Sequence, residues 1–256
     1  MEFEYIQYEK SEGIASIVLE HPPGNTLGLE MFPALTNIIS DVQRDEAVRV
    51  AIITGAGDQF FCAGADIREL RSTDANDFAL RGQVLFREIE ALSKPMIAAI
   101  NGAAFGGGCE LAMSCHLRIA ADTARFGQPE INYGLISCWG ATQRLPRLIG
   151  RTRALEMLLS GHAITARRAE EFGLITQVVP ARELSDAARK LAHQLVQAPP
   201  LAVKAILGCV DTGLIEGWEK GMDSERAGFD WVYHTDDARI GLHAFFSRQK
   251  PEFRGR

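Results

Sequence analysis

The stretch "AAFGGGCELAMSC" at residues 103–115 decides the fold class, because it joins an apolar segment to a helical pattern through three consecutive glycines. Glycine costs roughly 0.5–1 kcal/mol relative to alanine inside regular structure. A chain that keeps Gly106, Gly107 and Gly108 directly before Glu110 therefore has backbone there that another group approaches closely. We expect a tight strand-to-helix turn, with Glu110 in the first turn of the helix.

A second turn of the same kind lies earlier in the chain. "FCAGADI" at residues 61–67 follows an apolar run at 48–55, as the glycine turn follows an apolar run at 96–101. Small residues expose backbone N–H groups, and a helix N-terminus adds unpaired donors and a partial positive charge. Two such turns side by side can direct two N–H groups at one oxygen, as in an oxyanion hole. The same glycines also fit a plain tight connection, but they do not fit the spacing of a dinucleotide-binding loop.

Around these turns the chain alternates strands and helices. Two apolar or alternating runs at 3–8 and 13–20 predict a β-hairpin, and apolar spacing over 29–45 predicts a helix. The near-continuous apolar run at 48–55 is typical of a strand covered on both faces. A comparable order of strands and helices recurs between about residues 77 and 121, so we expect an α/β core.

Strand patterns fade after about residue 140, where helical patterns dominate. No Gly/Ser-rich or Pro-rich linker separates this part from the rest, so we expect it to pack on the core or on another subunit. The helical patterns lie at residues 153–159, 166–173, 183–198, 200–213 and 241–249.

Composition limits the possible partners. The chain has 256 residues, of which 46% are hydrophobic, and this suits a well-buried core. A formal net charge of −6 without clusters of Lys and Arg argues against nucleic acid or an anionic membrane as a partner. No apolar run reaches the roughly 18–20 residues of a membrane span, and "MEFEYIQYEK" at the N-terminus does not resemble a secretory signal.

The cysteines and histidines indicate neither disulfides nor a metal site. The five cysteines are irregularly spaced and form no C-x-x-C pair, which predicts free thiols in a reducing cytoplasm. The six histidines show no metal-ligand spacing. We therefore expect no metal.

Two carboxylates are candidates for acid–base chemistry. Glu110 has a structural alternative, since a carboxylate in a first helical turn complements the helix dipole by about 0.3–1 kcal/mol. Glu130, in "FGQPEINYGL", follows a Gln-Pro pair that indicates a turn or an extended segment. The apolar neighbours Phe126 and Ile131 would partly desolvate Glu130 and raise its pKa toward values useful for proton transfer. Each residue alone remains compatible with an ordinary structural or solvated role.

Four motifs in this order resemble the crotonase superfamily, and within it the enoyl-CoA hydratases: "FCAGADI", "INGAAFGGGCELAMSCHLRIAAD", "FGQPEINYGL" and "TQRLPRLIG". The similarity extends to the aromatic and basic tail "GLHAFFSRQKPEFRGR". It implies an α/β fold built as a spiral of repeated β-β-α units over residues 1–195. Residues 196–256 would form an α-helical C-terminal region that assembles trimers or dimers of trimers, that is, hexamers.

The resemblance also implies an activity. It is that of a cytoplasmic lyase of fatty acid metabolism, a hydro-lyase that acts on an acyl-CoA thioester. Water would add across the 2,3 double bond of a 2-enoyl-CoA and give a 3-hydroxyacyl-CoA through an enolate. No cofactor is implied, because coenzyme A is part of the substrate.

Motif by motif, the resemblance assigns the site residues. The backbone N–H groups of Ala65 and Gly107 match the oxyanion hole, and Glu110 and Glu130 match the two hydratase carboxylates. Glu130 corresponds to the principal acid/base, while Glu110 holds and activates the water. The residues expected to bind substrate are Ala63, Ala65, Asp66, Ile67, Arg68, Gly107, Cys138 and Trp139.

The chain departs from the hydratase pattern directly after "PEINYGL". Ser137 stands where the family usually has proline, Cys138 replaces a glycine, and Trp139 replaces a small residue. Cys138 still supplies the N–H that family hydratases use to hold water, provided that its φ is not positive. A nucleophilic role for its thiol finds no histidine nearby in the sequence. Trp139 either packs in the core or lines and shortens the acyl pocket, which would favour short, branched, aromatic or cyclic acyl groups.

Three alternatives remain at this point. A Δ3-Δ2-enoyl-CoA isomerase commonly works with one carboxylate, so the pair Glu110 and Glu130 favours hydration. A specialised acyl-CoA dehydratase of the same family would run the same step in reverse. A non-catalytic relative that binds acyl-CoA or RNA would show eroded carboxylates or a basic face, and this sequence has neither.

Overall fold

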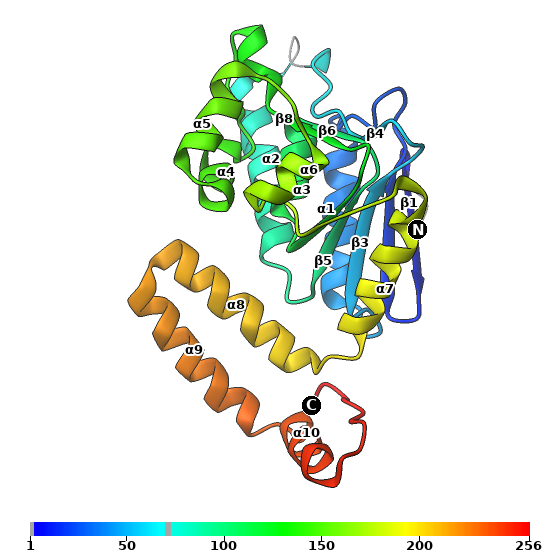
Figure 1. Ribbon diagram of the computed structural model, residues 1–256, viewed down its shortest axis with the longest axis vertical. Coiled ribbons are helices and arrows are strands. Elements are labelled where there is room, and N and C mark those ends of the chain that lie inside the picture. Colours follow the sequence, from blue (N-terminus) through cyan, green and yellow to red (C-terminus); the bar gives the residue numbers. More distant parts are fainter. Residues whose placement is uncertain (1–2, 70–72) are drawn as a thin grey trace.

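Two β-sheets and their helices make up the upper part of the molecule in Figure 1, a computed structural model that describes residues 3–69 and 73–256. The first sheet has the order β1-β2-β3-β5-β7-β10, with the bounds Ile6–Ser11, Ile14–Leu19, Val50–Gly55, Met96–Ile100, Leu117–Ala121 and Gln177–Val179. The second sheet has the order β4-β6-β8-β9, with the bounds Phe60–Cys62, Ala103–Phe105, Arg125–Gly127 and Ile164–Thr165.

The helices fall into a group around the sheets and a group at the C-terminal end (Figure 1). The first group comprises α1 (Met31–Arg44), α2 (Ala75–Glu90), α3 (Gly107–Ser114), α4 (Ala141–Ile149), α5 (Arg151–Ser160), α6 (Ala166–Phe172) and α7 (Leu184–Val196). The second comprises α8 (Pro200–Glu216), α9 (Trp218–Tyr233) and α10 (Asp236–Ser247). Two short 3-10 helices are η2 (Pro129–Tyr133) and η3 (Ala181–Glu183).

Successive strands alternate between the two sheets, and this produces a spiral. β3 joins the first sheet, β4 joins the second, and α2 follows; β5, β6 and α3 repeat the unit, and β7 and β8 lead through η2 to α4. Pairing is parallel along β2-β3-β5-β7 and along β4-β6-β8. The expected α/β spiral of repeated β-β-α units is confirmed.

The predicted N-terminal hairpin is present. β1 and β2 pair in antiparallel register from Ile6↔Leu19 to Ser11↔Ile14. The two residues between them, Glu12 and Gly13, have φ values of 53° and 79°, as a two-residue hairpin turn that follows the strand twist requires. The first strand begins three residues later than its sequence pattern predicts.

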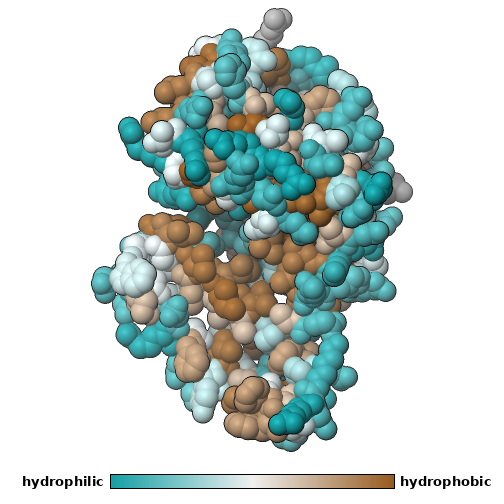
Figure 2. Space-filling view, in the orientation of Figure 1, coloured by the Kyte–Doolittle hydropathy of each residue, from teal (hydrophilic) through white to brown (hydrophobic). Residues whose placement is uncertain are grey.

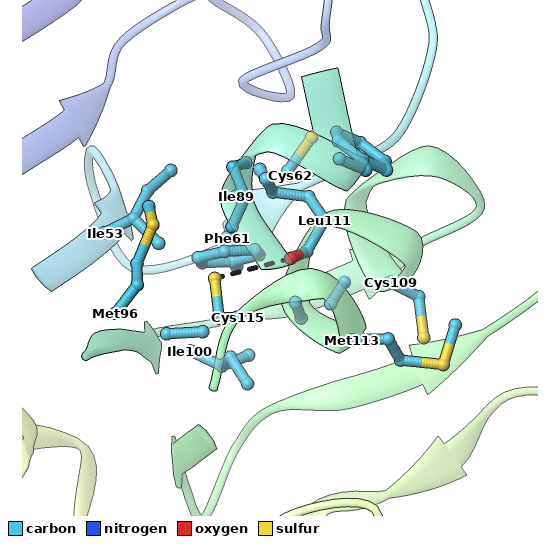
Figure 3. Packing of buried hydrophobic residues seen from close by; sticks show 14 of the residues in the cluster. Ile53, Phe61, Cys62, Ile89, Met96, Ile100, Cys109, Leu111, Met113 and Cys115 are labelled. Atoms are coloured by element: carbon cyan, nitrogen blue, oxygen red, sulfur yellow. Dashed lines mark hydrogen bonds between the residues drawn. The ribbon is translucent and has the colours of Figure 1, made fainter. Parts of the chain in front are cut away.

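The core lies between the sheets and the helices α1, α2 and α3. Helix α1 buries the side chains that its periodicity predicts, and its only proline lies in the first turn, where the missing N–H is tolerated. Figure 3 shows the centre of this core, where Ile53, Ile89, Met96 and Cys115 surround the ring of Phe61. Burying one such ring contributes about 1.5–3 kcal/mol, so the strands that carry the site are firmly held.

Several elements were not predicted. β9 and β10 are too short for a periodic signal; β10 is recognisable only by its parallel pairing with β7, and β9 by its antiparallel pairing with β8. Helix α9 was missed because it has no apolar stripe facing the core: none of its residues, all of which are described, is buried. The segment around Glu130, for which a turn or an extended segment was predicted, forms the turns of the 3-10 helix η2.

Helices α8, α9 and α10 project away from the two sheets (Figure 1). α8 and α9 pack against each other as a helical hairpin, with Gly217 at its corner in a positive-φ conformation that favours glycine. The chain leaves the first sheet between α7 and α8, near the expected boundary at residues 195 and 196. The division into two units at that boundary stays a prediction.

No single helix in the described residues is long and apolar enough to cross a membrane. The segments Ala181–Val196 and Pro200–Glu216 pass the criteria of length and composition only as a pair, bent by 106°.

Candidate active site

The three glycines of the turn before α3 each allow a different close approach. A Cβ on Gly106 would lie 2.7 Å from Oε1 of Glu130, and one on Gly107 would lie 2.2 Å from the indole of Trp139. A Cβ on Gly108 would lie 2.0 Å from the carbonyl oxygen at the end of β4. Gly106 also has a φ of 50°, which few other residues adopt. The turn therefore brings a carboxylate, an aromatic ring and the neighbouring strand to one place.

The two turns singled out in the sequence lie against each other. A Cβ on Gly64 would be 3.1 Å from the nitrogen of Gly107, and a Cβ on Gly107 would be 3.4 Å from the nitrogen of Ala65. Neither of these two amides donates a hydrogen bond to another described residue. For Gly107 the reason is its place at the start of α3, where N–H groups have no partner inside the helix. The arrangement is that of two adjacent free donors, and their role in an oxyanion hole stays a prediction.

Glu110 is almost fully buried, with 1% of its surface exposed. Its Oε1 accepts hydrogen bonds from the backbone N–H groups of Trp139, at 2.9 Å, and Ala141, at 2.7 Å. Burial raises the pKa of Glu110 to about 7, and the charge of Glu130 adds to this while the two backbone donors oppose it. The carboxylate therefore interacts with the start of α4 and not mainly with the dipole of its own helix.

Glu130 lies on η2 and is partly buried. Burial raises the pKa of Glu130, and the hydroxyl of Ser137 lowers it. When the amide of Gln128 is oriented with its nitrogen toward Glu130, that nitrogen lies 3.2 Å from both carboxylate oxygens. Gln128 is not among the site residues predicted from the sequence. Its signal was a polar residue two positions before Glu130 in a segment of small and apolar residues.

Cys138 lies beside both carboxylates. Its backbone φ is not positive, so the condition for supplying its N–H is met, and its carbonyl accepts a hydrogen bond from Gln83 at 2.8 Å. Burial raises the pKa of the Cys138 thiol to about 12, with further contributions from Glu110 and Glu130. The thiol is therefore protonated near neutral pH, which argues against a nucleophilic role.

Trp139 is buried in the core, with 1% of its surface exposed. The indole N–H donates to a backbone carbonyl of α2 at 3.2 Å. A Cβ on Gly82 in the middle of α2 would lie 2.2 Å from the indole, as a Cβ on Gly107 would. The ring therefore lies between α2 and the glycine turn, and it is both core packing and a neighbour of the free amide of Gly107. Three rings from α1 and α2 surround it at centroid distances of 5.1 to 5.7 Å: Phe32, Phe78 and Phe86.

Arg144, from the motif "TQRLPRLIG", fixes the loop that carries Cys138 and Trp139. Its guanidinium donates to both carboxylate oxygens of Glu90 on α2, at 2.5 and 2.9 Å, and to the carbonyl of Trp139 at 2.6 Å. A two-point contact of this kind fixes geometry as well as charge. The motif is recognisable in the sequence, but no role for this arginine was predicted from it.

The expected substrate-binding segment borders the free amides. The N–H of Ala63 donates a hydrogen bond to the backbone carbonyl of Gly24 at 2.8 Å. Asp66 is buried, and its carboxylate accepts hydrogen bonds from Arg68, which hold the pKa of Asp66 below its usual value. Ile67 and the side chain of Arg68 are exposed. Asp66 therefore shapes the turn, while Ile67 and Arg68 face outward, and contact of this segment with substrate stays a prediction.

A metal ion finds no evident set of ligands in the described chain. Among these residues no group of three or more His, Cys, Asp or Glu side chains lies close enough to hold one. The five cysteines are all free.

Comparison with known proteins identifies the family of the chain. The family model described as enoyl-CoA hydratase/isomerase matches residues 9–256. A crotonyl-CoA hydratase of Syntrophomonas wolfei is 39% identical over 99% of both chains, and a short-chain-enoyl-CoA hydratase of Clostridium acetobutylicum is 36% identical over 98% of both. The crystal structure of an enoyl-CoA hydratase from Bacillus anthracis superposes with a TM-score of 0.95 at 34% identity, over 99% of this chain and 100% of that one. The chain belongs to the enoyl-CoA hydratase/isomerase family, whose crotonase fold it shares.

Proposed function

We propose that the chain is an enoyl-CoA hydratase, which adds water across the 2,3 double bond of a 2-enoyl-CoA to form a 3-hydroxyacyl-CoA. One observation carries the proposal: two carboxyl groups, the buried Glu110 and the partly buried Glu130, lie around the turn where the free amides of Ala65 and Gly107 meet. An isomerase would need only one of the two carboxylates. Relatives over the whole chain length bear hydratase names, which supports the same choice.

The two amides would stabilise the charge that develops during the reaction. When the oxygen of water bonds to C3, the electron pair of the double bond moves toward the thioester, whose oxygen becomes negative. The N–H groups of Ala65 and Gly107 would donate hydrogen bonds to this oxygen. Loss of one such donor typically lowers the rate on the order of 10²–10³-fold. Protonation at C2 then restores the thioester and completes the addition of H and OH.

The two carboxyl groups would divide the proton transfers. Oε1 of Glu110 accepts two backbone hydrogen bonds and is thereby fixed, so that Oε2 is left to hold and activate the water. Glu130 would act as the principal acid/base, because its carboxylate lies at Gly106 beside the start of α3. The raised pKa of both groups brings them closer to neutral pH, where general acid–base catalysis is most effective. This scheme uses no metal or redox cofactor, and coenzyme A enters as part of the substrate.

We propose short acyl chains as the substrates. Trp139 fills the space between α2 and the glycine turn, where the hydratase pattern has a small residue. The names crotonyl-CoA hydratase and short-chain-enoyl-CoA hydratase of two relatives point the same way. Ile67 and Arg68, which are exposed beside the free amide of Ala65, would border the coenzyme A moiety.

We further propose that the enzyme works in the cytoplasm as a homotrimer or a dimer of trimers. The five free cysteines support a reducing compartment. Large apolar side chains exposed on α8, α9 and α10 support assembly, because a surface of this kind is usually covered by another chain.

A panel assay tests the function. The purified chain is mixed with 2-enoyl-CoAs of increasing length, and with branched and cyclic ones, while loss of the conjugated thioester absorbance is followed. We expect the fastest loss on short chains. The variant Glu130→Gln should bind acyl-CoA with little change and turn over roughly 10²–10⁴-fold more slowly. Turnover near the wild-type rate would remove Glu130 from the mechanism. No loss across the panel, together with migration of a 3,4 double bond, would identify an isomerase instead.

A further inference from the structure

The chain departs from the hydratase pattern at three consecutive positions, and Ser137 is the first of them after Glu130 in the sequence. The Ser137 side chain is buried, with 5% of its surface exposed, and Gln128 beside it has 1% of its surface exposed. The Ser137 hydroxyl and the Gln128 amide lie 2.9 Å apart. A proline here, as the family pattern has, would provide neither a hydroxyl nor a backbone N–H.

The hydrogen-bond geometry connects both side chains to Glu130. With its nitrogen toward the carboxylate, the Gln128 amide lies 3.2 Å from both Glu130 oxygens and 2.9 Å from Oγ of Ser137. Its two protons then serve Glu130 and Ser137, one each. Because Ser137 accepts from Gln128, its own proton remains available to the carboxylate, whose pKa the Ser137 hydroxyl lowers.

We propose that Ser137 is a positioning residue, which together with Gln128 holds the carboxylate of Glu130 ionised and aimed at the glycine turn. This inference rests on the proposed function, in which Glu130 exchanges protons with water and substrate. An isolated carboxylate in this place would be free to rotate and to become protonated. The Gln128 amide, which Ser137 holds in place, contacts both carboxylate oxygens and opposes both changes.

The surrounding charges make this role necessary. The titratable groups that face Glu130 are the carboxyl group of Glu110 and the thiols of Cys109 on α3 and Cys138 on the following loop. None of these three is a cation that could favour the charged form. Burial disfavours the ionised form. Neutral hydrogen-bonding groups such as Ser137 and Gln128 therefore favour ionised Glu130 against this effect.

Removal of the Ser137 hydroxyl tests the proposal. In Ser137→Ala, the acidic limb of the kcat/KM profile should move to higher pH by about one unit, since a hydrogen bond to a charged group is worth roughly tenfold or more in the protonation equilibrium. Near neutral pH, kcat should fall about tenfold, because one charge-assisted hydrogen bond that positions the carboxylate is lost. KM should change little. The alkaline limb should stay in place.

Two further substitutions separate positioning from packing. Ser137→Thr keeps the hydroxyl and should retain the wild-type acidic limb. Ser137→Val has the volume of the threonine variant but no hydroxyl, and it should behave like Ser137→Ala. The threonine and valine variants also distinguish positioning from packing if the alanine variant fails to fold. Ser114→Ala is the matched control, because Ser114 is equally buried and its hydroxyl donates only to the carbonyl of Leu111, at 2.8 Å. It should keep the wild-type profile.

The outcomes of the inference and of the function are distinct. If the wild-type chain hydrates no 2-enoyl-CoA, the proposed function fails before Ser137 is tested. If the wild type is active and the valine and threonine variants share one acidic limb, the inference about Ser137 is overturned while the function stands. A shifted limb in the valine variant alone supports it.

Discussion

The carboxyl group of Glu110 titrates near neutral pH because burial outweighs the two backbone N–H groups that favour its charged form. In the unfolded chain the pKa of the same group is near 4.5. The folded protein therefore binds this proton more tightly than the unfolded chain does. Between about pH 4.5 and pH 7 the native state holds the extra proton, so this residue lowers the stability of the fold as the pH rises.

Glu110→Gln tests this effect, because the amide cannot ionise and still accepts from the two backbone N–H groups. At pH 5 the variant and the wild type should differ little in free energy of unfolding. At pH 8 the variant should gain up to about 3 kcal/mol over the wild type, since each unit of pKa shift corresponds to about 1.4 kcal/mol. Thermal unfolding at both pH values measures it, with the exposed Glu9→Gln as the control. A difference that does not change with pH would contradict the raised pKa.

At the scale of elements, helix α2 contains a glycine that local propensity does not explain. Alanine at Gly82 should stabilise an isolated helix by about 1 kcal/mol. The Cβ of that alanine would, however, lie 2.2 to 2.4 Å from the indole of Trp139. Packing of α2 against the loop after η2 therefore opposes the helical preference of α2 itself.

Gly82→Ala should lower the free energy of unfolding by about 1–3 kcal/mol, the usual cost of overpacking a core. In a Trp139→Ala background the same change should cost nothing or stabilise, because the clash is gone and the helical preference remains. A double-mutant cycle by denaturant unfolding measures this coupling. Equal effects in the two backgrounds would mean that the indole does not limit position 82.

The variant Trp139→Ala also reports on the acyl pocket. The loss of the indole opens space beside the free amide of Gly107. The preference in the panel assay should then move toward longer or bulkier acyl groups. A profile identical to that of the wild type would mean that Trp139 is core packing alone.

Elements with a local signal could be predicted from the sequence. The hairpin turn at Glu12 and Gly13, helix α1 and the glycine turn before α3 each follow from residues within a few positions of one another. The alternation of strands between two sheets was expected only through the resemblance to a family.

Features that depend on distant pairing could not be predicted. Arg144 meets Glu90 across 54 positions, and Gln83 meets the carbonyl of Cys138 across 55. β10 is a strand only through its parallel pairing with the edge of β7. The surroundings of Glu110 and Glu130 belong to this class, because the pKa values of both carboxyl groups depend on burial that no single segment creates.

At the scale of the whole molecule, α8 has a composition that its surroundings do not match. The helix is strongly apolar, yet no residue of α8, which is described throughout, is buried. A helix that is apolar on most sides is normally enclosed. A cavity of about 690 Å³ opens between α8 and α9, and Figure 2 shows hydrophobic side chains gathered below the core. The exposed apolar side chains of the two helices include Ile206, Val210, Leu214, Trp218, Met222 and Phe229.

This surface predicts an oligomer whose assembly depends on α8. Sedimentation or light scattering of the wild type should give about three or six times the chain mass of 28.1 kDa. Val210→Asp and Leu214→Asp each place a charge where apolar contact is expected, and burying an unpaired charge costs several kcal/mol. Both variants should therefore dissociate. Lys190→Glu, at an exposed position of α7, should keep the wild-type mass. A monomeric wild type would contradict the assembly, and aspartate variants of unchanged mass would move the interface away from α8.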